Sequence, residues 1–291
     1  MFSLHNGDFS HWEISSTKKV IVLVAIRNLR TIMKMNEKLK IFYEVWREWG
    51  INMTLKATLD YIGMKNYITI KYPKTDIEVI VRTKPFWKKL EQGEHEPHVF
   101  EFILNAIKEG QIIFDVGSWI GPYTLLFSKL VDRDGRVIAF EPSPSTFNIL
   151  LDNLEKNNIS NVTTENICLG NYVGKIGLRG SGKEASIVRW GETEVPEIVP
   201  CITIDKYCKD NDIVPDVIKI DVEGAEGLVI EGAKNIIKSY SPCILLEFHG
   251  NFFNEKERNE CWNKITKFAK KIIHLNENQK YHSRCHVIIK Y

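Results

Sequence analysis

The sequence predicts an α/β fold, in which a mostly parallel, seven-stranded sheet is covered by helices on both faces and follows an N-terminal extension. From about residue 96, short apolar runs typical of strands alternate with segments whose apolar residues recur at helical spacing. Strands that alternate with helices favour parallel pairing, with helices on the two faces of the sheet. The chain has 291 residues and 44% of them are hydrophobic, which is enough to build such a core.

The N-terminal extension is expected over residues 1–95, ahead of an α/β domain over residues 96–291. A helix with an aromatic face is expected over residues 37–49. Two strand-like runs follow, Tyr67–Tyr72 and Ile77–Thr83, and a four-residue turn joins them into a hairpin. A stretch with glycine and proline then ends the extension.

The elements of the α/β domain follow from apolar runs and from the signals that begin helices. Pro122 suits a first helical turn, where no backbone N–H is needed, and Ser143 or Ser145 can cap another helix. That helix would present one apolar face, made of Phe147, Leu150, Leu151 and Leu154. Strands are expected over residues 111–116, 136–140, 161–167, 216–220, 243–248, 271–275 and 285–290, with short β pieces over 170–203. Helices are expected over residues 100–107, 122–130, 143–154, 203–209, 223–238 and 255–270.

Charge, cysteine content and hydropathy exclude several classes of protein. The chain has 39 Lys+Arg against 37 Asp+Glu, whereas dedicated nucleic-acid binders usually carry a basic stripe. No two of the six cysteines form a C-x-x-C, so neither a structural zinc site nor a redox pair is expected. The apolar run Val20–Ile26 is too short for a spanning helix of about 20 residues. We therefore expect a soluble, cytoplasmic protein with reduced thiols and no transmembrane segment.

A glycine loop lies between the first strand of the domain and the following helix, where α/β sheets bind ligands. Asp115 and Gly117 begin it, Ser118 follows, and Gly121 ends it. The G-x-x-x-G spacing of the glycines is not the G-x-G-x-x-G that cradles a pyrophosphate. An aspartate at the strand end suits a cofactor with a positive amino group and no phosphate.

Glu141 ends the next strand, 26 residues after Asp115. An acidic residue there can accept hydrogen bonds from both hydroxyls of a ribose. Together the two features indicate a nucleoside with an aminoacyl tail, S-adenosyl-L-methionine (SAM). The alternative is a tight turn followed by a solvent-facing glutamate. Asn166, after the third strand, could hydrogen-bond adenine or could simply serve the turn.

Several motifs of this chain resemble those of a known family. Residues 111–130 resemble the first motif of class I SAM-dependent methyltransferases, and the run I-K-I-D-V-E-G-A-E at residues 218–226 resembles the signature of the FkbM family. Three further stretches fit the family's layout in order, namely residues 141–144, residues 161–170 with 201–207, and residues 245–249. The likeness covers about residues 94–291. The family's loop usually reads D-V-G-A-N-I-G, and here Ser118 and Trp119 replace Ala and Asn.

The resemblance implies a Rossmann-like class I methyltransferase fold and O-methylation of a hydroxyl. Members of the family act on sugars, polyketide-like products and related small molecules, so the expected partner is a glycan or small-molecule hydroxyl acceptor and not a nucleic acid. Two alternatives stay open. An RNA methyltransferase would need a basic surface, and a non-catalytic SAM-fold binding module would have lost the site residues.

Lys219, Asp221, Glu223 and Glu226 gather at the end of the fourth strand, which lines the ligand crevice of open α/β sheets. Lys219 and Asp221 should share one face of the strand, because side chains alternate. Asp221 is the first candidate for acceptor binding or for the general base, with Glu223 and Lys219 as orienting partners. Glu226 in a first helical turn also suits the helix dipole.

His249, just past the fifth strand, is the other candidate base, and the alternative is a partly exposed loop histidine. Carboxylates could hold Mg²⁺, but no second carboxylate-rich cluster is evident in the sequence, so no metal is expected. No Asn-Pro-Pro-Tyr or Asp-Pro-Pro-Tyr follows the fourth strand, which argues against methylation of a base or glutamine nitrogen.

Overall fold

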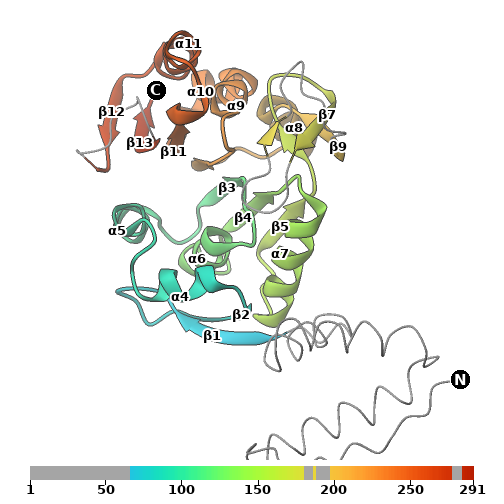
Figure 1. The fold of residues 1–291 in the computed structure, drawn as a ribbon, viewed down its shortest axis with the longest axis vertical. Coiled ribbons are helices and arrows are strands. Elements are labelled where there is room, and N and C mark those ends of the chain that lie inside the picture. The colour runs from blue at the N-terminus through green and yellow to red at the C-terminus, as the bar shows by residue number, and fades with distance from the viewer. Residues whose placement is uncertain (1–65, 180–185, 188–196, 277–283) are drawn as a thin grey trace, which may run out of the picture. The chain divides into compact units, whose positions relative to one another are not determined.

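The computed structural model describes residues 66–179, 186–187, 197–276 and 284–291. The helix expected over residues 37–49 lies outside the described residues. The described compact unit begins at Asn66 (Figure 1).

A seven-stranded sheet forms the centre of this unit, in the order β12-β13-β11-β10-β3-β4-β5. Its strands are β3 Ile112–Val116, β4 Arg136–Phe140, β5 Val162–Glu165, β10 Val217–Ile220, β11 Cys243–His249, β12 Lys271–His274 and β13 Arg284–Lys290. The strands from β11 to β5 pair in parallel, whereas β13 pairs antiparallel with β11 and β12. The predicted fold class, a mostly parallel sheet in a Rossmann-like α/β fold, is confirmed.

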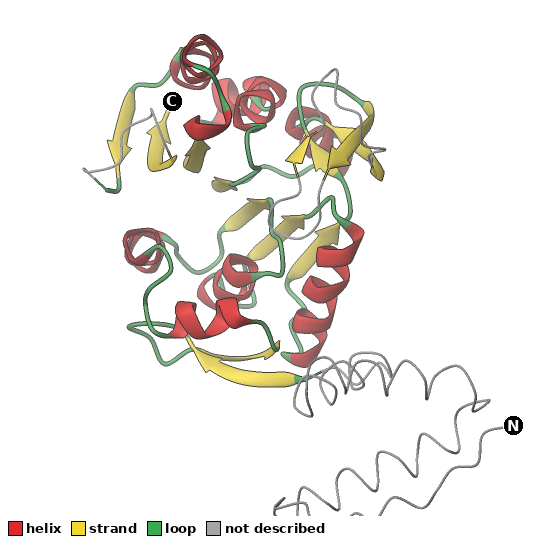
Figure 2. Cartoon of the chain, in the orientation of Figure 1, coloured by secondary structure: helices red, strands yellow, loops and turns green. Residues whose placement is uncertain are grey.

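Helices cover both faces of the sheet, as predicted (Figure 2). Alternation along each strand divides the core in two, so that Ile113 of β3 packs on one face and Phe114 on the other. The first face is covered by α5 Pro97–Ala106, α6 Pro122–Leu130 and α7 Pro144–Lys156. The second face is covered by α8 Ile204–Asn211, α9 Glu226–Gly232, α10 Lys234–Tyr240 and α11 Glu255–Thr266. A short 3₁₀ helix, η2 Gly250–Phe252, follows β11.

The hairpin expected in the extension packs on the same core as the first group of helices. It consists of β1 Tyr67–Lys71 and β2 Glu78–Arg82, and α4 Pro85–Glu91 follows. The hydroxyl of Tyr72 donates a 2.6 Å hydrogen bond to the carbonyl of Pro122 in α6. Asn153 of α7 accepts a 2.7 Å hydrogen bond from the backbone N–H of Arg82. The compact unit therefore starts some 30 residues before the expected boundary at residue 95, because the apolar face of the hairpin is buried only against these helices.

A second, four-stranded sheet follows β5, with the order β6-β9-β7-β8. Its strands are β6 Cys168–Leu169, β7 Gly174–Arg179, β8 Ser186–Ile187 and β9 Glu197–Ile202. The strands β7, β8 and β9 are the short β pieces expected over residues 170–203, whereas β6 precedes that range.

Two predictions about helices need correction. The single helix expected over residues 223–238 is two helices, α9 and α10, because the carboxylate of Asp205 accepts the N–H groups of Asn235 and Ile236 and so caps a new helix there. The first of the two helices begins at Glu226, so Glu223 lies in the turn before α9. Leu151, expected on the apolar face of α7, is 40% exposed.

Candidate active site

The glycine loop between β3 and α6 brings the cofactor motif against the end of β10. Gly117 has a φ of 80°, and a Cβ atom built there would lie 1.8 Å from the carbonyl oxygen of Asp221. Gly121 has a φ of 90°, and its Cβ atom would lie 2.6 Å from Cδ1 of Leu150. Both positions therefore require glycine. The first glycine lets the loop touch the residue predicted to act on the acceptor.

Ser118 and Trp119 fix the loop to the next strand. The Ser118 hydroxyl lies 2.9 Å from the carbonyl oxygen of Asp115 in β3 and 3.2 Å from that of Phe140 in β4, within hydrogen-bond distance of both. Trp119 has a φ of 51°, and its N–H donates to Oε2 of Glu141 at 2.8 Å. Its indole packs edge-on against Phe86, with 4.7 Å between ring centroids. Asn adopts positive φ more readily than Trp, so this tryptophan carries a backbone shape better suited to the family's usual residue.

Glu141 is 5% exposed at the end of β4, which excludes the solvent-facing alternative. Besides Trp119, the N–H of Ser143 and the hydroxyl of Thr146 donate to its Oε1 at 2.9 and 2.8 Å. Burial raises the pKa of this carboxyl, and the hydrogen bonds from Ser143, Thr146 and Trp119 partly oppose that rise. A carboxylate has about four acceptor positions, so Oε2 keeps one for a ligand hydroxyl.

Three predicted cofactor residues, Asp115, Gly121 and Asn166, do not line the cavity beside the loop. Asp115 is fully buried, accepts a 2.6 Å hydrogen bond from the Thr124 hydroxyl, and faces Lys219 with its other oxygen. Asn166 donates from Nδ2 to the carbonyls of Glu141 and Pro142, at 2.8 and 3.0 Å. The Asn166 amide thus serves the turn, and Asp115 holds Lys219 and α6 in place.

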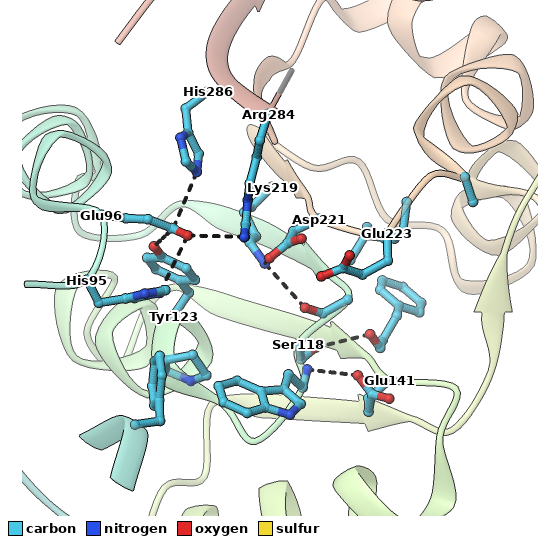
Figure 3. A pocket seen from close by; sticks show the side chains of 18 of the residues that line it. His95, Glu96, Ser118, Tyr123, Glu141, Lys219, Asp221, Glu223, Arg284 and His286 are labelled. Carbon is cyan, nitrogen blue, oxygen red and sulfur yellow. Dashed lines mark hydrogen bonds and ion pairs between the residues drawn. The ribbon is translucent and has the colours of Figure 1, made fainter. Parts of the chain in front are cut away.

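Lys219 connects the cofactor loop to the acidic cluster (Figure 3). Its buried ammonium lies 3.5 Å from Oδ1 of Asp115 and 3.3 Å from Oδ2 of Asp221, and it donates to the carbonyl of Gly117. Burial lowers the pKa of Lys219, but the charges of Asp221, Asp115 and Glu96 outweigh burial and raise it overall. The prediction that Lys219 and Asp221 share a face of the strand is therefore confirmed.

His249 ends β11 and is 1% exposed, so the partly exposed alternative is wrong. Its Nδ1 lies 2.7 Å from Oε1 of Glu226. Its Nε2 lies 3.5 Å from Oε2 of Glu223, and 3.8 Å from both Oδ1 of Asp221 and Oε1 of Glu247. Burial opposes the charged imidazolium, but the hydrogen bond and charge of Glu226, with Asp221 and Glu223, raise the pKa of His249 to about 9.

Glu223 reaches this cluster through an unusual backbone. Its φ is 51°, and the φ of the following Gly224 is 98°. The turn before α9 thereby keeps Glu223 beside Asp221 and His249 instead of starting the helix. Burial raises the pKa of Glu223, and the charge of His249 opposes that rise.

A second group of site residues was not predicted from the sequence: Glu96, Tyr123, Glu247, Arg284 and His286. Glu96 contacts Arg284 and His286 at 3.5 Å and accepts the Tyr123 hydroxyl (Figure 3). Register pairs Glu247 with His286 and His249 with Arg284 across β11 and β13, and the Arg284 side chain contacts Glu247. Alternation in L-L-E-F-H could have placed Glu247 beside His249. The sequence gives no sign that Arg284 and His286 face this site. The register in which β13 pairs with β11 cannot be read from the residues of either strand alone.

The cofactor loop and part of the charged residues line a cavity of about 780 Å³, which is large enough for a nucleoside cofactor with part of an acceptor. His249, Glu226 and Glu247 lie behind its wall. Gly117, Ser118, Trp119 and Glu141 form one part of its wall, beside Ile167 and Cys168. Lys219, Asp221 and Glu223 form another part, with Glu96, Arg284 and His286 beyond them.

The methyltransferase FkbM domain matches residues 115–281, more than half of the chain. The chain belongs to the FkbM methyltransferase family. It is a SAM-dependent methyltransferase, and S-adenosyl-L-methionine is its cofactor. The predicted family, enzyme class and cofactor are thereby confirmed. No helix in the described part of this family member combines the length and apolar character needed to cross a bilayer.

Relatives of this FkbM-family chain include a hexuronic acid methyltransferase, AglP, from Haloferax volcanii. It is 29% identical over 155 residues, which are 53% of this chain and 62% of that protein. The structure of methyltransferase FkbM from Methylobacillus flagellatus shares 16% identity with a TM-score of 0.45, over 72% of this chain and 56% of that one. A SAM-dependent O-methyltransferase from Thermotoga maritima shares 13% identity with a TM-score of 0.43, over 80% of each chain.

Proposed function

We propose that this enzyme transfers a methyl group to a hydroxyl of a glycan or small-molecule acceptor. The observation that carries the proposal is the position of Asp221. Its side chain is 23% exposed in the cavity, and it lies between the ammonium of Lys219 and the ring of His249. A carboxylate at that point, in contact with the cofactor loop at Gly117, can orient a hydroxyl and take its proton.

The residues of the cofactor loop fit SAM. When bound, SAM supplies a methyl group on a sulfonium, which is already a good leaving group. The remaining acceptor position on Oε2 of Glu141 suits a ribose hydroxyl. The glycine backbone at Gly117 permits close approach of a ligand. Asp115 acts indirectly, because it is fully buried and holds Lys219.

Asp221 is the better candidate for the general base. With its pKa raised to about 9, His249 is largely protonated at neutral pH and cannot accept a further proton. Its charge instead opposes the rise in the pKa of Glu223 that burial causes. Lys219 contacts Asp221 at 3.3 Å, and the His249 ring lies 3.8 Å from its other oxygen. This arrangement supplies positioning and proton removal, which is what transfer to a hydroxyl requires.

A glycan acceptor is supported by the relative named as a hexuronic acid methyltransferase. Lys89 and Arg284 line the same cavity and offer cationic groups to an acidic sugar. We also place the reaction in the cytoplasm, since all six cysteines are free thiols.

An assay with radiolabelled SAM and the full chain tests the proposal. We expect label in a glycan or small-molecule fraction, and label that only ribonuclease releases would instead establish an RNA acceptor. An Asp221→Asn variant should bind SAM as the wild type does and lose about 10²–10⁴-fold in transfer rate. Wild-type transfer by that variant would remove Asp221 as the base.

A further inference from the structure

The cluster around His249 has the composition of a metal site. Nε2 of His249, a carboxylate oxygen of Asp221 and one of Glu247 all lie within 4.8 Å of one another. The His249 side chain is 2% exposed, and its Nε2 finds no hydrogen-bond partner among the described residues. Carboxylates around a buried ring nitrogen favour a cation in that place, which is a proton on Nε2 without metal and a metal ion once that proton is displaced.

We propose that His249, Asp221 and Glu247 bind a divalent metal ion of the Mn²⁺ type beside the cofactor loop. One imidazole with two carboxylates suits Mn²⁺ better than Mg²⁺, which prefers oxygen ligands alone. Bonds of about 2.1 Å place neighbouring ligand atoms roughly 3.0–3.6 Å apart. Nε2 is 3.8 Å from each of the two carboxylate oxygens, so only a small contraction is needed.

The surroundings of the three ligands support a cation. Nδ1 of His249 lies 2.7 Å from the fully buried Glu226, so the ring donates one N–H there and turns Nε2 toward the cluster. Histidines that ligate metals usually donate their other N–H to a carboxylate. Phe252 stacks on the ring, with 5.6 Å between centroids. Glu226 is thus a positioning residue, and Glu223 stands 3.5 Å from Nε2 at the edge of the site.

The charge of the cluster is also suited to a dication. Asp221, Glu223, Glu226 and Glu247 surround His249, whereas Lys219 and Arg284 are the two cationic side chains in contact with them. If the His249 imidazole is neutral, the four carboxylates outnumber the two cationic side chains by two charges. No second carboxylate group near Asp221 is evident in the sequence, whereas the structure brings Glu247 of the neighbouring strand within reach of it.

The role of the metal rests on the proposed function. A cation there would hold the acceptor oxygen and lower the pKa of its hydroxyl. The proton would pass to Asp221, and the oxygen would then form the new bond to the methyl carbon as the bond from carbon to sulfur breaks.

Titration of the full chain with Mn²⁺, followed by the electron paramagnetic resonance of the free ion, tests the site. The titration is run at pH 7.5 and at pH 9, because protons compete with metals for Nε2. We expect one bound Mn²⁺ per chain, and Mg²⁺ should displace it only weakly. An unchanged signal of free Mn²⁺ at millimolar concentration and both pH values would overturn the proposal.

Variants separate the metal site from the cofactor site. His249→Asn removes Nε2 and should weaken Mn²⁺ binding by at least about 10-fold, while calorimetry still shows SAM binding. Glu226→Gln should weaken Mn²⁺ binding by about 10–100-fold, because Glu226 holds the His249 ring in its orientation. Glu94→Gln removes an exposed carboxylate at the rim of the cavity and should leave Mn²⁺ binding unchanged. Equal affinity in His249→Asn and the wild type would refute these ligands.

Failure of the metal site and failure of the proposed function give different results. Methylation of a hydroxyl acceptor that continues at full rate in EDTA, without Mn²⁺ binding, would overturn the metal and keep the O-methyltransferase. Mn²⁺ binding without transfer to any hydroxyl would keep the metal and overturn the acceptor class.

Discussion

Gly117 lies directly against the backbone of Asp221, so the cofactor loop and the proposed base are in contact although they are more than 100 residues apart in sequence. A Cβ atom at Gly117 would lie 1.8 Å from the carbonyl oxygen of Asp221. The Lys219 ammonium spans the same junction, since it donates to the carbonyl of Gly117 and contacts Asp221. Any shift of the loop therefore moves the acidic cluster as well.

Substitution of Gly117 by alanine should damage both parts of the site. The clash involves backbone and cannot be relieved by a rotamer change, so we expect a loss of roughly 3 kcal/mol or more in the free energy of unfolding. Gly110 provides the matched control. Its φ is also 80°, but a Cβ atom there meets nothing within 4 Å, so Gly110→Ala should cost only about 1–2 kcal/mol. Chemical denaturation measures both, and equal losses would show that the contact with Asp221 is unimportant.

Cofactor affinity should depend on the ionisation of Glu141. Burial raises the pKa of this carboxyl, and its protonated form loses an acceptor for the ribose. The dissociation constant for SAM should therefore be lowest above that pKa and should rise as the pH falls through it. Calorimetry across a pH series checks this. Glu141→Gln should bind about 10–100-fold more weakly and show a flatter pH profile, whereas a profile identical to the wild type would contradict the assignment.

Removal of the Lys219 charge should destabilise the fold. Lys219→Met leaves Asp115 and Asp221 without their shared cation, and breaking a buried pair typically costs about 3–5 kcal/mol. Because the pKa of Lys219 is raised in the folded state, its contribution is complete at neutral pH and is lost only as the pH rises through that pKa. Thermal unfolding measures this, and Lys89→Met, which alters an exposed lysine of the cavity, should have little effect.

The features predicted correctly depend on short stretches of sequence. The carboxyl ends of parallel strands lie at the same edge of a sheet. Gly117, Glu141 and Asp221 follow β3, β4 and β10, so the sequence could place them at one cavity. Alternation likewise put Lys219 beside Asp221. These inferences need no knowledge of how distant strands are aligned, and the structure reproduces them.

The features that were missed depend on contacts between distant segments. Arg284 and His286 enter the site through the antiparallel register of β13 on β11, and Glu96 enters from the turn before α5 with a φ of 44°. Asp115 is an error of another kind, because the sequence predicted a direct contact with the cofactor. Its place in the motif was correct, but its carboxylate contacts Thr124 and Lys219 inside the protein. Sequence pattern locates such a residue without saying what its side chain contacts.

Trp119 tests whether the loop works through its backbone or its side chain. Its N–H, not its indole, donates to Glu141, and its φ of 51° suits the asparagine that the family usually has. Trp119→Asn keeps the N–H that donates to Glu141 and should therefore keep the SAM dissociation constant within a factor of about two. The lost packing on Phe86 should instead appear as a higher KM for the acceptor. Trp119→Pro has no N–H and cannot adopt positive φ, so it should lose cofactor binding. Full SAM affinity in the proline variant would show that the hydrogen bond to Glu141 does not position the carboxylate.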